Sequence, residues 1–223
     1  AYQQALLLDP DNWDWKTNYA YSLIENEKFA QAASYLNELI RQDPNLTQLW
    51  RLKVNAHLSQ EDYHSALLDL EMMRRLTSLD GESLNLLGNL YMHESLYEQA
   101  TEQYIQAFNE GYPVTKATVQ QSLSNLVHFE QWTLADKYLR AVRRISQDIE
   151  LTQEDSDVLL LEAKLLQGKK QHERALSLLE KIIATSPLHH GALLMAAEIY
   201  ASNKRYIKAA LYYDRLIEAH GTS

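Results

Sequence analysis

Apolar residues recur at steps of three and four along most of the chain, which is the spacing that places them on one face of an α-helix. Within this pattern one alanine returns at a regular interval. These alanines are spaced by 34, 34, 35, 40 and 34 residues: Ala32, Ala66, Ala100, Ala135, Ala175 and Ala209. An aromatic residue precedes five of them by three positions, and His172 takes that place before Ala175. The pattern predicts a repeat of about 34 residues.

A second set of positions repeats in step with these alanines. Twelve residues before the alanines stand mostly small residues: Ala20, Val54, Gly88, Leu123, Ala163 and Ala197. Each repeat is therefore predicted to hold two helices, the first with a small residue in its middle and the second carrying the repeated alanine. Packed helices lie about 8–10 Å apart, and the short end of that range needs Ala or Gly at the crossing. Pro10, Pro44 and Pro187 end units, because proline cannot continue a helix.

Composition supports an all-helical chain. The 223 residues contain only 6 Gly and 4 Pro, too few for the tight turns of an all-β or a doubly wound α/β domain. No run approaches 18 consecutive apolar residues, so the sequence predicts no membrane span. The absence of Cys excludes disulfides, thiol nucleophiles and thiolate metal sites, and leaves the compartment open between cytosol and periplasm.

These registers resemble the tetratricopeptide repeat (TPR) family. Residues 81–113 match most closely, through Leu87-Gly88, Tyr91, Tyr97, Ala100, Tyr104 and Ala107. The resemblance implies a right-handed α-solenoid of antiparallel helix pairs, forming one domain. Its units are expected at 13–46, 47–80, 81–115, 116–155, 156–189 and 190–223, after a lone second helix in 1–12. That half-unit suggests a fragment of a longer repeat protein.

Some positions depart from the family pattern. Lys16 stands where the family often has a large apolar residue, His57 replaces the usual Tyr or Leu, and Leu123 is not small. The fourth unit is divergent, and six extra residues precede the fifth. We expect the first helix of the fifth unit to start near Gln153, after Thr152.

No motif for catalysis, a nucleotide or a metal is found, and we expect neither enzymatic activity nor a cofactor. The chain has no G-x-G-x-x-G, Walker loop, G-x-S-x-G or H-E-x-x-H. His189-His190 is a metal candidate without a third ligand in view, so a solvated turn is the better interpretation. Nucleic acid is disfavoured because the net charge is −9, and the Arg143-Arg144 doublet is interpreted as a solvated face.

In the resembled family the first helices line a concave groove that binds a peptide or a partner helix. Carried over onto this sequence, the groove residues selected are Asn18, Tyr21, Arg51, Asn55, Asn85, Asn89, Gln120, Gln121, Ser124, Leu161, Lys164 and Met195. Units one to four give an amide-rich stripe, whose carboxamides donate and accept hydrogen bonds and so suit an extended backbone. Amides acting as neutral surface filler is the alternative. The last two units are more apolar, as Leu161 and Met195 illustrate.

The charges at the groove positions limit the kind of partner that we expect. Acidic groove positions outnumber basic ones, which favours a neutral or basic segment. Arg51 and Asn55 match only part of the carboxylate clamp found in chaperone-binding TPR domains, and its other cationic positions are missing.

The sequence thus predicts a non-enzymatic protein-binding scaffold or adaptor. The alternative is the substrate-recruiting arm of a larger enzyme, such as a glycosyltransferase. Self-association through the half-unit or the last units is a third option.

Overall fold

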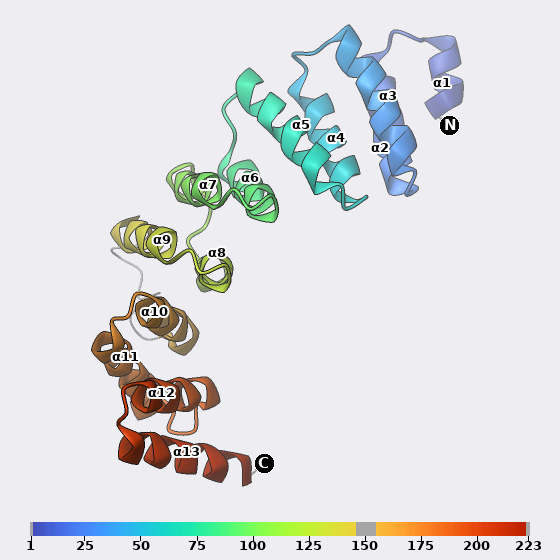
Figure 1. Ribbon diagram of the computed structural model, residues 1–223. Helices are drawn as coiled ribbons and strands as arrows, with labels where there is room; N and C mark the ends of the chain where they lie inside the picture. The colour runs from blue at the N-terminus through green and yellow to red at the C-terminus, as the bar shows by residue number, and fades with distance from the viewer. Residues whose placement is uncertain (1, 146–154, 222–223) are drawn as a thin grey trace. The chain divides into compact units, whose positions relative to one another are not determined.

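The computed structural model describes residues 2–145 and 155–221, and this part of the chain folds into helices joined by short turns (Figure 1). Their bounds are α1 Tyr2–Leu8, α2 Trp13–Glu25, α3 Phe29–Gln42, α4 Thr47–Leu58, α5 Tyr63–Leu76, α6 Gly81–His93, α7 Tyr97–Asn109, α8 Lys116–His128, α9 Trp132–Ile145, α10 Ser156–Gly168, α11 His172–Thr185, α12 His190–Ser202 and α13 Tyr206–Gly221. From α2 onward, successive helices pack as antiparallel pairs, and the predicted all-α solenoid of helix pairs is confirmed.

Contacts group the helices into two compact units, residues 1–112 and 113–223. In the first unit each helix from α1 to α6 packs against the next one, and α2 also contacts α4. In the second unit α8 to α13 pack in the same manner, with α8 against α10 and α10 against α12. The expectation of one continuous domain stays a prediction.

Every helix pair is joined by the same turn. After each first helix one residue other than glycine has a φ between 57° and 61°: Glu27, Glu61, Ser95, Glu130, Lys170 and Lys204. In the first pair Lys28 N–H donates to the Leu23 carbonyl at 2.8 Å, and Glu27 N–H donates to the Ile24 carbonyl at 2.9 Å. This is a Schellman motif, which satisfies the last carbonyls of the helix. The same two bonds recur in the other five pairs and turn the chain back within three or four residues.

Small residues lie where the two helices of a pair cross. The alanines of the second helices are all buried, as are Ala20, Gly88, Ala163 and Ala197 in the first helices. At Gly88 the approach is especially close, because a Cβ there would lie 2.6 Å from the ring of the buried Tyr104. The Tyr104 hydroxyl in turn donates to Asn89 Oδ1 at 2.9 Å. Packing at this crossing therefore also positions a side chain of the predicted groove.

In three of the pairs the residue that opens the second helix reaches the end of the next first helix. The Tyr63 ring lies 4.3 Å from the His93 ring, measured between centroids. Trp132 covers Gly168, where an added Cβ would meet the indole at 2.4 Å. His172, the imperfect member of the series, makes a polar contact of 3.0 Å with Asn203. These contacts fill the wedge between consecutive repeats within each unit.

Lys16 and His57, two of the departures from the family pattern, contact side chains of a neighbouring helix. Buried Lys16 donates to Gln42 Oε1 at 3.0 Å and lies over the Trp13 ring. His57 Nδ1 lies 2.8 Å from Asp69 Oδ2 on the neighbouring helix. Leu123 is fully buried in α8 in place of a small residue.

The expectation that the first helix of the fifth unit starts near Gln153 is wrong. Asp155 has an extended backbone, and its side chain accepts hydrogen bonds from the Asp157 and Val158 N–H groups, so it is the N-cap and α10 begins at Ser156. A carboxylate at this position satisfies the free N–H groups of the first turn, which stops the helix from extending backward. Thr152, Gln153 and most of the extra residues lie outside the described part of the chain.

Gly88→Ala is predicted to destabilise the protein. The new methyl group must displace the buried Tyr104 ring, and overpacking of this kind costs about 1–3 kcal/mol. Urea unfolding followed by circular dichroism measures the loss.

Gly191→Ala is the matched control, because it makes the same change within helix α12. Its new methyl group would meet the flexible end of the Leu160 side chain at 3.0 Å and the His189 ring at an ordinary contact distance of 3.6 Å. We expect this variant to be as stable as the wild type or slightly more stable, since Ala favours helix. Equal destabilisation of both variants would contradict the packing account.

Candidate functional site

The first helices of each unit lie next to one another and form what we call the first-helix face: α2, α4 and α6 in the first unit, and α8, α10 and α12 in the second. In the first unit Asn18, Tyr21, Arg51 and Asn55 are exposed on this face. Asn85 and Asn89 are half-buried. The first unit therefore presents four of the six residues predicted there to solvent.

The asparagines predicted to line the groove differ in how their side chains are held. Asn85 donates to the Tyr112 hydroxyl at 3.2 Å, and Asn89 accepts from the Tyr104 hydroxyl at 2.9 Å. Both amides are thus fixed by tyrosines, and each keeps further hydrogen-bonding capacity. Asn55 is exposed and lines a pocket between α4 and α6. Asn55 is accordingly the amide best placed to meet a ligand.

This pocket, which we call the Asn55 pocket, has a volume of about 200 Å³. Its floor is apolar and buried, formed by Val54, Leu70 and Met73. The remaining lining residues are Arg51, Asn55, Glu82, Ser83 and Leu86. The pocket thus combines an apolar base with an amide, a carboxylate and a guanidinium around it.

The arginine of the pocket is tied to the turn before α6. Arg51 Nη2 lies 3.3 Å from Asp80 Oδ2, and both side chains are exposed. Asp80 also caps α6 by accepting from the Ser83 N–H at 2.8 Å. Hydrogen bonds from the Ser83 side chain and backbone lower the pKa of Asp80 and outweigh the effect of its partial burial, and Arg51 lowers it further. The charge of Arg51 is therefore largely offset, whereas Glu82 projects into solvent beside the pocket.

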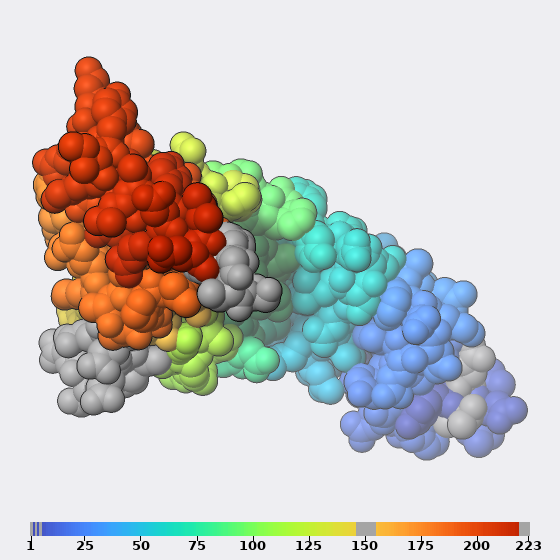
Figure 2. All heavy atoms as spheres, turned by 90° about the horizontal axis from the view of Figure 1, so that it is seen from below, coloured from blue at the N-terminus to red at the C-terminus, as the bar shows by residue number. Residues whose placement is uncertain are grey.

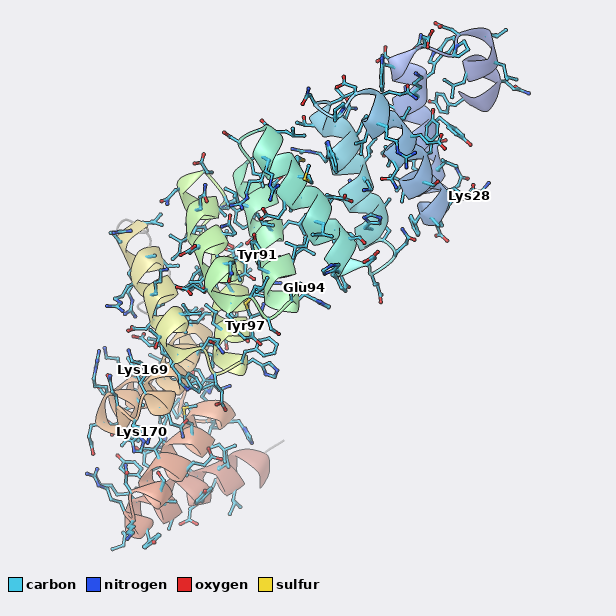
Figure 3. The ribbon with its side chains drawn as sticks, turned by 45° about the horizontal axis from the view of Figure 1, so that its top comes forward. Lys28, Tyr91, Glu94, Tyr97, Lys169 and Lys170 are labelled. Atoms are coloured by element: carbon cyan, nitrogen blue, oxygen red, sulfur yellow. The ribbon has the colours of Figure 1, made fainter. Side chains whose placement is uncertain are left out.

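Polar contacts between α4, α5 and α6 hold the helices around the pocket. The buried carboxylate of Asp69 in α5 lies close to two side chains of α4. Its Oδ1 is 2.7 Å from Lys53 Nζ, and its Oδ2 is 2.8 Å from His57 Nδ1. Tyr91 of α6, labelled in Figure 3 with Glu94 and Tyr97, donates to Glu71 of α5. Burial, as the largest cause, and then the hydrogen bond to Glu71 and its charge raise the pKa of Tyr91 to about 12, against an opposing effect of Arg74.

The second unit presents fewer of its predicted residues. Gln121, Ser124 and Lys164 are exposed, and Gln120 is half-buried. Leu161 and Met195 are buried, and Met195 belongs to a core cluster of α10 to α13. These two side chains are core residues and offer little surface to a partner, because the apolar positions of α10 and α12 pack inward.

Charge differs strongly between the two units. Residues 1–112 carry 7 Lys and Arg against 17 Asp and Glu, whereas residues 113–223 carry 14 against 13. The net charge of −9 thus resides in the first unit, and the Asn55 pocket lies in this acidic half. A surface of one sign attracts partners of the opposite sign.

The floor of the Asn55 pocket could not be predicted from the groove pattern, because that pattern includes residues of first helices alone. Leu70 and Met73 belong to the second helix α5 and rise between α4 and α6. Their apolar spacing signalled a core helix, and nothing in that pattern tells a core position from the base of a pocket.

Apolar side chains are exposed at both ends of the helix series. Leu7 and Leu8 of α1 are 82% and 85% exposed. In α13, whose red atoms lie at the surface in Figure 2, Ile207 is 90% exposed and Leu211 58%. These faces are where self-association would occur, and that option stays a prediction.

The helices of the described residues and their His, Asp and Glu side chains bear on two other kinds of site. None of the helices there is long and apolar enough to cross a membrane. In the same residues no three or more His, Asp or Glu side chains gather in a way that could hold a metal ion.

Comparison with known proteins decides the family. A model of the tetratricopeptide repeat matches residues 1–55, and the model described as the tetratricopeptide repeat protein 21 ARM repeat matches residues 112–212. The chain belongs to the tetratricopeptide repeat family. TPR proteins generally act as non-catalytic scaffolds for protein–protein interaction, and the TPR fold found here indicates a protein or peptide partner.

Solved structures show the same TPR fold. The C-terminal part of a TPR repeat-containing protein from Cytophaga hutchinsonii has a TM-score of 0.64 at 20% identity, covering 92% of this chain and 80% of that one. MamA from Desulfovibrio magneticus RS-1 has a TM-score of 0.58 at 18% identity, covering 79% of this chain and 96% of that one. At these identities the likeness concerns the fold alone.

One curated relative resembles part of this TPR chain. A Haemophilus influenzae protein named for cytochrome c-type biogenesis, CcmH, is 32% identical over 90 residues. The match covers 39% of this chain and 20% of that protein, so it concerns a repeat segment of a longer molecule.

Tyr91→Phe is predicted to lower the free energy of unfolding near neutral pH. The variant should also lose less of that free energy than the wild type does as the pH rises. Removing the hydrogen bond to Glu71 costs about 1 kcal/mol. The pKa of Tyr91 is raised on folding, so its contribution is complete below the unfolded pKa of about 10 and disappears as the pH rises to about 12. Urea midpoints measured from pH 8 to 11.5 test this.

Tyr21→Phe removes a hydroxyl from an exposed position on α2 and serves as the control. Its midpoints should follow the wild type throughout. If Tyr91→Phe also followed the wild type across the whole range, the role assigned to the Tyr91–Glu71 bond would be wrong.

Proposed function

We propose that this TPR protein is a non-catalytic scaffold whose first-helix face in residues 1–112 binds an extended, neutral or basic peptide segment, with a lysine side chain of the peptide in the Asn55 pocket. The observation that carries the proposal is the composition of that pocket. Its apolar base suits the aliphatic stem of lysine, and the exposed Glu82 carboxylate suits the ammonium group.

Asn55 supplies the second part of the recognition. A carboxamide can donate to a peptide carbonyl and accept from a peptide N–H, so it holds backbone regardless of the side chains. Asn18 and Tyr21 are exposed on α2 and extend the polar surface of the same unit. A segment of several residues would thereby meet groups from more than one repeat.

The helices present these groups already ordered. Asn89 is fixed by Tyr104, Arg51 by Asp80, and the helices beneath by the Lys53–Asp69–His57 cluster. Because the scaffold loses little freedom on binding, the entropic cost falls mainly on the peptide. The excess of 17 acidic over 7 basic residues in this half also favours the approach of a basic segment.

The test is selection from a phage-displayed library of random decapeptides, followed by affinity measurement for the selected peptides. We expect the selected sequences to be enriched in lysine. The double variant Asn55→Ala with Glu82→Gln should bind them at least about tenfold more weakly, as expected for loss of a charge-assisted contact and a hydrogen bond.

The matched control is Asn37→Ala with Glu38→Gln. Both residues are exposed on the second helix α3, and this variant makes the same chemical changes outside the first-helix face. It should bind as the wild type does. Selection without enrichment of lysine, or equal loss in both double variants, would refute the proposal.

A further inference from the structure

A second pocket lies in residues 113–223, between first and second helices. It has a volume of about 280 Å³ and is formed by α9, α10 and the start of α11. Its base is apolar, with Leu139, Leu165 and Leu166 buried. We call it the arginine pocket, because of the side chains around it.

Four cationic side chains and two carboxylates from three successive helices line the arginine pocket. The cations are Arg140 and Arg143 of α9, Lys169 of α10 and Arg174 of α11, and the carboxylates are Asp136 and Glu162. Lys169 and its neighbour Lys170 lie at the end of α10 in Figure 3. The pocket therefore has two more positive than negative charges.

The carboxylates are already engaged. Asp136 Oδ2 lies 3.0 Å from Arg140 Nη2 and 2.6 Å from Lys169 Nζ. Glu162, which is buried, lies 2.6 Å from Arg143 Nη2. Arg174 Nη1 donates to the neutral amide oxygen of Gln171 at 2.6 Å, the contact recorded for it within the described residues. The side chains that line the pocket therefore carry more positive charge than its two carboxylates neutralise.

The arginine pocket sets this unit apart from the equivalent place in the first one. Arg74 stands eight residues after Ala66, as Arg143 stands eight residues after Ala135. Arg74 pairs with Glu71 of its own helix, at 2.8 Å, whereas Arg143 reaches across to Glu162 of α10. Since α9 packs less closely against α10 than α11 does against α12, room remains between the helices for a ligand.

We propose that the arginine pocket is a second binding site, which takes an acidic peptide segment by admitting a glutamate or aspartate carboxylate between Arg140, Arg143 and Arg174. A guanidinium has five N–H donors, so each arginine can keep its present bond and donate to a further carboxylate. The aliphatic stem of a glutamate lies on the leucine base.

The ligand group proposed for the pocket is a carboxylate. The incoming anion must share the cations with Asp136 and Glu162, which stay within 3.0 Å of them. A phosphate monoester, with up to two negative charges at neutral pH, is attracted by the same cations, and competition with phosphate separates the two ligand groups. The site is thereby distinct in charge from the Asn55 pocket, which favours basic segments.

The test uses isothermal titration calorimetry of the full chain with an acetylated hexaglutamate amide, at 0.05 M and 0.3 M salt. We expect binding at low salt that weakens at high salt, because ions screen partly exposed charges. The variant Arg140→Gln with Arg174→Gln should lower the affinity at least about tenfold. Both side chains are exposed, and thermal melting verifies that this variant stays folded.

The matched control is Arg144→Gln with Lys181→Gln. It removes the same charge from exposed positions on the same two helices, α9 and α11, outside the pocket. Its affinity should stay within about twofold of the wild type. Inorganic phosphate at millimolar concentration should not displace the peptide.

Three results would overturn the proposal. They are no binding of hexaglutamate at low salt, equal weakening in the two double variants, and displacement of the peptide by phosphate, which would assign the site to phosphate instead. Binding of lysine-rich peptides should be the same in wild type and pocket variant, so the outcome is independent of the Asn55 pocket.

Discussion

Close approach between the two helices of each pair is the constraint on which the rest of the structure depends. A hairpin of two short helices has a small apolar area, so its stability depends on tight packing within the pair and against its neighbours. Buried Ala and Gly at the crossings allow that approach, and six Schellman turns return the chain within three or four residues. Gly88 shows how little room remains, because its neighbour Tyr104 occupies the space of a Cβ. The same tyrosine orients Asn89 of the predicted groove, so core packing and surface geometry are linked.

The arrangement of helices could be predicted from sequence because it follows from periodicity. An alanine every 34 residues and a small partner twelve residues earlier fix the pairing, and proline and turn residues mark the ends. The start of α10 was missed because Thr152 looked like a cap, whereas Asp155 performs that role. A capping assignment depends on local backbone geometry, which composition does not reveal. Lys16 and His57 likewise could be recognised as departures, but their partners Gln42 and Asp69 become neighbours only on packing.

The candidate sites could be predicted only in part. The exposure of Asn18, Arg51 and Asn55 agrees with their helical phase, since they lie opposite the buried positions of α2 and α4. Leu161 and Met195 have the same phase in the family pattern but are buried. The Arg143-Arg144 doublet was interpreted as a solvated face, whereas Arg143 contacts buried Glu162 beside a pocket. Whether an arginine points to solvent or into a pocket depends on the next helix, and the irregular 40-residue spacing made its position unpredictable.

The two halves of the chain offer different chemistry on one repeat architecture, an acidic face in residues 1–112 and a basic pocket in residues 113–223. Hydrogen–deuterium exchange of the full chain, with and without a saturating lysine-rich peptide from the library, tests the account most directly. The account predicts that the peptide slows exchange in α4 and α6, where it would cover the Asn55 pocket. Slowed exchange confined to the second helices α3, α5 and α7 would contradict it.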